Sequence, residues 1–197
     1  MLGWWWYIWN QRELRRRYDQ IRSNISIDQA RVTLAAIGNA AFQRLVMRLD
    51  ALDVVVGAEC LMPAHVARCH PRLGLTLALP GRKPMIWLNL AKHRDDASLI
   101  DTVAHESIHA TIIMLGRSRQ TPQPDSTINY HAEEIVALSG ANWILKEIAF
   151  PAKREMALNR AAILQLRPTL VGLGCTEQFI QEKVEQGVRA GKFLLDS

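Results

Sequence analysis

One short string in the chain has the residue types and spacing to bind a metal ion and use it, His105-Glu106-Ser107-Ile108-His109. The two histidines are four residues apart, so on a helix their imidazoles lie on one face, about one turn apart, and can reach the same ion. Glu106 would lie beside that ion and take a proton from a water molecule in an open coordination position. The string therefore predicts half of a zinc site with a general base next to it.

The residues around this string predict the helix that its chemistry requires. Asp95 or Asp96 can cap the start of the helix, and Gly116, followed by basic residues, marks its end. Between these signals, apolar residues recur at helical spacing and form a stripe that would be buried: Leu99, Ile100, Val103, Ile108 and Ile112. We expect a helix over about residues 97–115.

Two histidines do not complete the site, because catalytic zinc usually has three protein ligands. A second apolar helix is expected from Tyr130 to about Ile148, and Glu134 near its start is the candidate for the third ligand. Another interpretation stays open at this point. A histidine pair can be hydrogen-bonded within a core, and Glu133-Glu134 can be a solvated helix start that interacts with the helix dipole.

The two motifs together resemble a known class of enzymes. H-E-x-x-H followed about 25 residues later by E-x-x-A resembles the gluzincin metallopeptidases. The longer string Y-x-x-E-E-I-V-A over residues 130–137, with Gly140-Ala141 behind it, is similar to the zincin domain of ArdC-type antirestriction proteins of phages and plasmids. It is more distantly similar to the ImmA/IrrE peptidases. The resemblance covers about residues 75–145, and Leu138 departs from it where the antirestriction pattern tends to carry a second acid.

This resemblance implies a zinc-dependent endopeptidase of the gluzincin type, from a phage or another mobile element. Zn²⁺ would be bound by His105, His109 and Glu134, since Glu134 pairs with Ala137 in the E-x-x-A register. Glu106 would be the general base, and Tyr130 and His131 are further candidate catalytic residues. Tyr130 would donate to the developing oxyanion, although both residues could equally serve as supporting contacts around the ligands.

We expect two parts in the chain. Residues 1–25 would form a Trp-rich, basic appendage, and residues 26–197 a zincin-like metallopeptidase domain. Residues 1–50 carry eight arginines against four acids, a large share of the formal net charge of +5. The apolar start is too short to span a bilayer and lacks the features of a signal peptide. The tryptophans could pack on the fold or a partner chain, lie at a membrane surface, or stack on unpaired bases beside arginines. These residues are Trp4, Trp5, Trp6 and Trp9, with Arg12, Arg15, Arg16 and Arg17.

The appendage also suggests an alternative function. The protein would then be a nucleic-acid-associated, antirestriction-like accessory protein, and its zinc site would be structural or vestigial. The expected partner is otherwise a peptide or protein substrate. Three cysteines, an odd number, without a signal peptide favour a cytoplasmic location without a disulfide framework. A second zinc site at Cys60, His65, Cys69 and His70 has looser spacing than structural sites usually show.

The expected fold class is α+β, a mostly helical minimal zincin with a small antiparallel sheet. Pro80-Gly81-Arg82-Lys83 predicts the turn of a hairpin over about residues 73–90, packed on the helix that carries the two histidines. Residues 85–90 would form its edge strand, to which an extended substrate could add. Residues 52–57 predict another short strand, and residues 27–49 one long helix. Two further helices are expected over residues 152–166 and 176–190.

Overall fold

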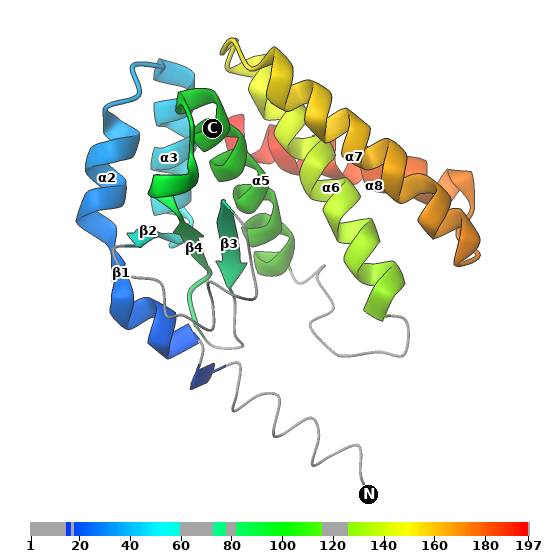
Figure 1. The fold of residues 1–197 in the computed structure, drawn as a ribbon, viewed down its shortest axis with the longest axis horizontal. Helices are drawn as coiled ribbons and strands as arrows, with labels where there is room; N and C mark the ends of the chain where they lie inside the picture. The colour runs from blue at the N-terminus through cyan, green and yellow to red at the C-terminus, as the bar shows by residue number, and fades with distance from the viewer. Residues whose placement is uncertain (1–14, 17, 60–72, 78–81, 116–125, 197) are drawn as a thin grey trace, which may run out of the picture.

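A computed structural model describes residues 15–16, 18–59, 73–77, 82–115 and 126–196. In these residues a small sheet is surrounded by helices, in an α+β fold that is mostly helical, as predicted (Figure 1). The elements in chain order are β1 (Ile25–Ser26), α2 (Ile27–Ala35), α3 (Ala40–Ala51), β2 (Val55–Glu59), β3 (Gly74–Leu77), β4 (Met85–Leu88), the 3₁₀ helix η1 (Leu90–Lys92), α5 (Asp96–Met114), α6 (Ser126–Glu147), α7 (Lys153–Gly172) and α8 (Glu177–Leu195).

The four strands form a mixed sheet in the order β1-β2-β4-β3. The two arms of the predicted hairpin, β3 and β4, pair antiparallel, with Thr76 opposite Ile86. The sheet was expected to be purely antiparallel. It is mixed instead, because β2 lies parallel to β4, with Val56 opposite Ile86. Strand β4 is therefore an interior strand, and β1 and β3 are the two edge strands among those that the structure describes. All four residues of β4 are buried, as expected for a strand covered on both faces.

The alternation of β4 divides the interior into two layers. Ile86 and Leu88 belong to the main core, which they share with α5 and α6. Met85 and Trp87 lie on the opposite face, where they pack against Tyr18 and Ile21 of the helical residues 18–24. Within the predicted appendage of residues 1–25, residues 18–24 thus pack on the sheet and Ile25 belongs to its strand β1, while the tryptophans of residues 1–14 lie outside the described residues.

The single helix expected over residues 27–49 is two helices, α2 and α3. The break falls at Gly38-Asn39, where Asn39 caps α3 by accepting a hydrogen bond from the Phe42 N–H at 2.9 Å. The Asn39 amide also donates to the carbonyl oxygen of Ile148 at 3.0 Å, and this bond ties the start of α3 to the end of α6. The hydrogen bond of the Asn39 side chain to the backbone therefore starts a new helix here, and α2 does not continue into α3.

Helix α5 begins as predicted, because the Asp95 carboxylate accepts a hydrogen bond from the Ser98 N–H at 2.8 Å. Its apolar stripe is buried and packs between the sheet and α6. Helices α6, α7 and α8 lie together on the other side of α5 from the sheet (Figure 1). The stack places α5 in the centre of the fold, with the sheet on one side and a helical layer on the other.

Helix α8 continues through Gly191 to Leu195, so the prediction that it ends at residue 190 is wrong. A Cβ atom at Gly191 would lie 2.8 Å from the Trp143 ring and 3.2 Å from the Gly140 carbonyl oxygen, and one at Gly187 would clash with the carbonyl oxygen of Val136. These glycines allow α8 to approach α6 closely instead of ending the helix. No helix among the described residues combines the length and apolarity needed to cross a membrane.

Candidate metal centre

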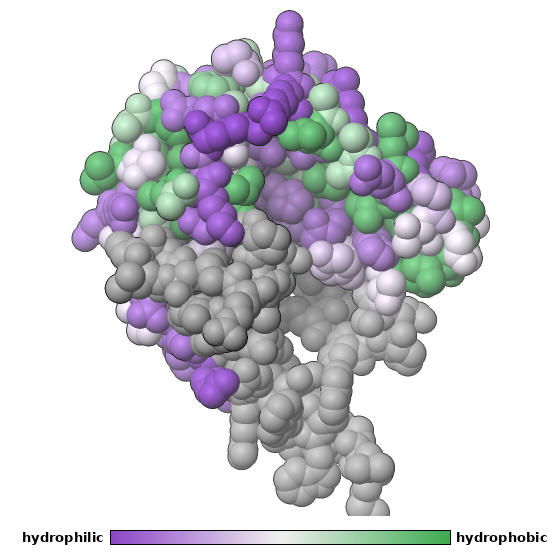
Figure 2. Space-filling view, in the orientation of Figure 1, coloured by the Kyte–Doolittle hydropathy of each residue, from purple (hydrophilic) through white to green (hydrophobic). Residues whose placement is uncertain are grey.

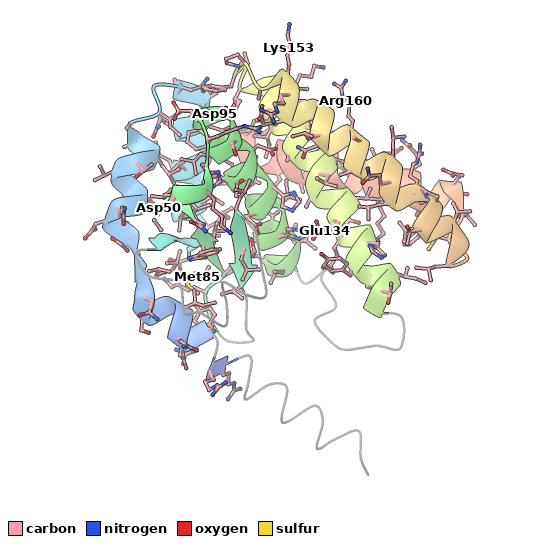
Figure 3. The ribbon with its side chains drawn as sticks, in the orientation of Figure 1. Asp50, Met85, Asp95, Glu134, Lys153 and Arg160 are labelled. Carbon is pink, nitrogen blue, oxygen red and sulfur yellow. The ribbon has the colours of Figure 1, made fainter. Side chains whose placement is uncertain are left out.

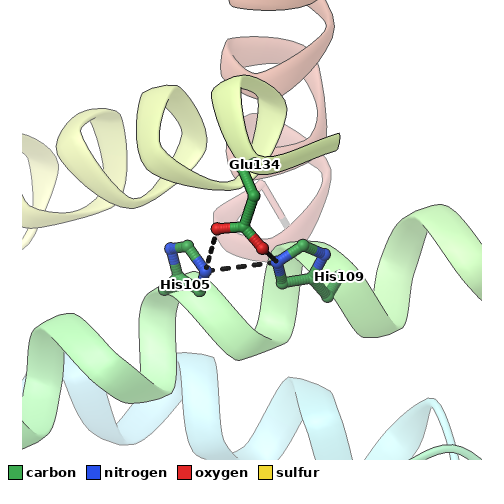
Figure 4. A group of neighbouring side chains, drawn as sticks. All are labelled: His105, His109 and Glu134. Atoms are coloured by element: carbon green, nitrogen blue, oxygen red, sulfur yellow. Dashed lines mark hydrogen bonds and ion pairs between the residues drawn. The ribbon is translucent and has the colours of Figure 1, made fainter. Parts of the chain in front are cut away.

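Two helices bring the three predicted ligands together. His105 and His109 extend from α5, and Glu134 extends toward them from the facing α6 (Figure 3, Figure 4). The two Nε2 atoms are 3.1 Å apart. The Glu134 carboxylate spans both imidazoles, with Oε2 at 3.6 Å from His105 Nε2 and Oε1 at 3.6 Å from His109 Nε2. The donor atoms of all three residues lie within 4.8 Å of one another.

These separations fit a zinc ion. Two ligand atoms at about 2.0–2.1 Å from a tetrahedral ion lie about 3.3 Å apart, close to the distances in this cluster. Two histidines and one carboxylate are also a donor set that zinc uses in catalytic sites with an open fourth position. Neighbouring Nε2 atoms that both point at a carboxylate are well arranged to share one cation. The residues present therefore fit the predicted Zn²⁺.

The cluster is largely shielded from solvent, since the exposed fractions of the three side chains lie between 17% and 21%. At His109, burial opposes the charged imidazolium, but a hydrogen bond to Glu134 and the nearby Glu106, Glu134 and Glu133 carboxylates outweigh it. The net result is a raised pKa of His109. The surroundings favour positive charge at this point, whether it is a proton or a metal ion.

Glu106, the predicted general base, is buried on α5 and its side chain is held by the edge strand. Thr76 Oγ1 on β3 lies 2.7 Å from Glu106 Oε2 and 2.9 Å from the Glu106 carbonyl oxygen. Gly74, two residues earlier on the same strand face, leaves room for the helix, because a Cβ there would lie 2.6 Å from Thr102 Cγ2 and 3.1 Å from Glu106 Cγ. The strand thus contacts α5 closely at the general base.

A cleft of about 450 Å³ opens over the cluster between β3, α5 and α6. Figure 2 shows this face of the molecule, with hydrophilic side chains gathered in a hollow near its centre. Tyr130 lines the cleft and is half exposed, as a group that must meet a substrate can be. The lining residues are Leu73, Gly74, Leu75, Thr76, Asp101, Thr102, His105, Glu106, His109, Tyr130, Glu133 and Glu134.

His131, the other candidate catalytic residue, is not among the residues that line this cleft. Its ring packs edge-on against Tyr130, with 5.5 Å between the ring centroids. Its Nδ1 atom is buried and has no hydrogen-bond partner among the described residues. This placement fits the alternative in which His131 contacts its neighbours around the site.

Asp101 is a cleft residue that the sequence analysis missed. It lies one helical turn before His105 on α5, and Asn159 of α7 donates a hydrogen bond to its Oδ1 at 2.8 Å. Burial raises the pKa of Asp101 to about 6, with a further rise from Glu155 and an opposing effect of the Asn159 hydrogen bond. Glu155 itself is buried and paired with Arg94. The signal in the sequence is the spacing of four residues between Asp101, His105 and His109, which places all three on one helix face.

The remaining predicted residues lie at the front of the chain or in the segment after β2. Arg15 and Arg16 are described and exposed. The four tryptophans, Arg12 and Arg17 are outside the described residues, as are Cys60, His65, Cys69 and His70 of the alternative zinc site. Among the residues that the structure describes, His105, His109 and Glu134 form the group that could hold a metal ion.

No known family model, curated protein or solved structure matches the chain.

Proposed function

We propose that the protein is a zinc-dependent peptidase that hydrolyses peptide bonds. The observation that carries this proposal is the convergence of His105, His109 and Glu134 at the floor of a cleft, with Glu106 beside them. A structural zinc site is usually closed by a fourth protein ligand, whereas among the described residues this cluster has three ligands and opens onto a cleft large enough for part of a peptide. The resemblance of the two motifs to gluzincins supports the same reaction.

Each residue of the cleft then has a role in the reaction. Zn²⁺ held by His105, His109 and Glu134 would supply a Lewis acid and lower the pKa of bound water toward about 7. Glu106 accepts a proton from the attacking water and returns it to the leaving amine. Tyr130 lines the cleft from α6, across from Glu106 on α5. Its hydroxyl group donates a hydrogen bond to the oxyanion that develops on the scissile carbonyl.

The edge of the sheet gives the cleft a place for an extended substrate. Because β4 is interior, the strand addition that we predicted for residues 85–90 is instead assigned to β3, which is one of the two edge strands of the described sheet and, unlike β1, lines the cleft. The backbone groups of β3 on the side away from β4 would hydrogen-bond with a substrate strand. This arrangement favours an unfolded segment or loop of a protein over a small compact substrate.

The first test is the zinc content of Glu134→Ala beside the wild-type protein. We expect about one zinc per wild-type chain and loss of most of it in the variant, because one of three ligands is removed. Glu147→Ala, at an exposed position of the same helix, is the matched control and should retain zinc. Glu133→Ala separates the two neighbouring acids and should also retain it. Equal zinc in Glu134→Ala and wild type would refute the assignment of the third ligand.

The second test is Glu106→Gln, which keeps the size of the side chain and removes the base. We expect bound zinc and the melting temperature to stay near wild type, while hydrolysis of internally quenched peptides falls by about 10²–10⁴-fold. An unchanged cellular or biochemical function of Glu106→Gln would favour the nucleic-acid-associated protein instead. In that case, salt-dependent affinity for single strands should be measurable.

A further inference from the structure

We propose that Thr76 is a positioning residue for the general base, and that its hydroxyl sets the orientation of the Glu106 carboxylate in both protonation states. The inference rests on the proposed peptidase function and adds a residue of the edge strand to the machinery of α5. It is carried by the two contacts of one hydroxyl group with a single buried residue, at 2.7 Å to Oε2 and 2.9 Å to the backbone carbonyl of Glu106.

The pleat of β3 directs Thr76 at α5. Gly74 and Thr76 lie on the face toward the helix, whereas Leu75 and Leu77 pack on the opposite face with Met85 and Trp87. The absence of a side chain at Gly74 lets the strand approach until the Thr76 hydroxyl reaches the carboxylate. A strand further away would leave Glu106 Oε2 buried without this donor.

The contact matters because Glu106 must be a base in one step and an acid in the next. While Glu106 is ionised, the Thr76 hydroxyl donates its hydrogen to Oε2, which leaves Oε1 to accept the proton of the water. Once Oε1 carries that proton, Oε2 is the carbonyl oxygen of the neutral acid and still accepts the Thr76 hydrogen, so the carboxyl group keeps its orientation. The same hydroxyl donor therefore serves Glu106 both as a carboxylate and as a neutral acid. The proton count of the reaction is unchanged, because Thr76 neither gains nor loses a proton.

The central comparison is Thr76→Val with Thr76→Ser, measured on the quenched peptide that the wild type cleaves fastest. Valine keeps the shape of the side chain and lacks the hydroxyl, so we expect kcat to fall by about 10–100-fold with little change in KM or bound zinc. Serine keeps the hydroxyl and should retain kcat within about 3-fold of wild type. Thr111→Val is the matched control, since Thr111 is a buried threonine of α5 whose hydroxyl donates to the Ser107 carbonyl of its own helix.

A second measurement needs neither metal nor substrate. In the zinc-free protein, Thr76→Val should lower the melting temperature by about 3–6 °C because Oε2 loses its donor, and by less than half as much in a Glu106→Ala background. If Thr76→Val does not fold, Thr76→Ala replaces it in both measurements, because alanine places no methyl group against the carboxylate.

Three results would overturn the inference while the proposed function stands. They are wild-type kcat in Thr76→Val, equal loss in the serine and valine variants, and zinc loss in Thr76→Val as large as in Glu134→Ala. A wild-type protein that binds zinc but is no more active than Glu106→Gln would overturn the proposed function. The melting temperatures of the zinc-free variants would then still decide whether Thr76 holds Glu106.

Discussion

Replacing Asp101 by asparagine should stabilise the protein at neutral pH. The aspartate lies in the cleft wall, where burial raises its pKa from 3.8 to about 6. A carboxyl group with a raised pKa binds its proton more tightly in the folded than in the unfolded chain. Ionisation therefore favours unfolding, and asparagine removes this penalty while its carbonyl oxygen can still accept the hydrogen bond from Asn159.

The magnitude follows from the shift. A rise of about two pKa units corresponds to about 3 kcal/mol at 1.36 kcal/mol per unit, and partial exposure of the side chain reduces the expected gain to about 1–3 kcal/mol. The loss of stability caused by ionised Asp101 is absent below pH 3.8, the pKa in the unfolded chain. It grows as the pH rises from 3.8 to about 6 and is complete above about pH 6. The advantage of Asp101→Asn should therefore be full at pH 7.5 and fall to about a third by pH 4.5.

Urea unfolding of the zinc-free proteins at these two pH values measures the effect, with the free energy of unfolding compared between variant and wild type. Asp50→Asn, at an exposed position of α3, is the control and should change the free energy of unfolding by less than about 0.5 kcal/mol at either pH. An Asp101→Asn protein that is less stable than wild type at pH 7.5, or whose gain does not depend on pH, would refute the reasoning.

Three further predictions concern the metal, the helix packing and the N-terminus. Protons compete for His109, whose pKa is raised, so zinc measured after dialysis should be lost as the pH falls through about 6.5, and full retention at pH 4.5 would contradict the ligand set. Gly187→Ala should destabilise the protein by about 1–3 kcal/mol in thermal unfolding because of the clash with Val136, whereas Gly172→Ala, with open space around it, should stabilise it by about 0.5–1 kcal/mol. The reverse order would be inconsistent with the close packing of α6 and α8. Deleting residues 1–9 should spare zinc and peptidase activity, and a large fall in melting temperature together with zinc loss would show that these residues belong to the core.

The sequence was most informative where local chemistry determines local structure. Asp95 and Thr176 cap their helices as their residue types predict, because a side-chain oxygen can satisfy an N–H of the first turn without help from the rest of the fold. The spacing of His105 and His109 also needs only the geometry of one helix. A second apolar helix with acids near its start predicts that an acid lies opposite the histidines, and the choice of Glu134 over Glu133 came from the resemblance to the E-x-x-A motif.

Interactions between distant elements were less predictable. The interior position of β4 depends on the parallel partner β2, whose pairing leaves no mark in the residues of β4 beyond their apolar character. Gly191 has the residue type of a helix stop, and only the neighbouring α6 makes it a packing position. Thr76 likewise gains its role from a strand register that brings it to Glu106, and no motif records that contact.

The glycine contacts between α6 and α8 also bear on the order in which the protein can mature. The helix that carries Glu134 packs along α8, which follows every ligand of the site in the chain. During synthesis, at about 5–20 residues per second, the three ligands emerge several seconds before α8 is complete. Until then, α6 packs mainly on α5 and α7 and lacks the most extensive of its helix contacts, so we expect Glu134 to be held less firmly opposite the histidines. The proposed metal site is therefore expected to become fully ordered late in biosynthesis, so that the proposed hydrolytic activity would arise only when most of the chain has folded.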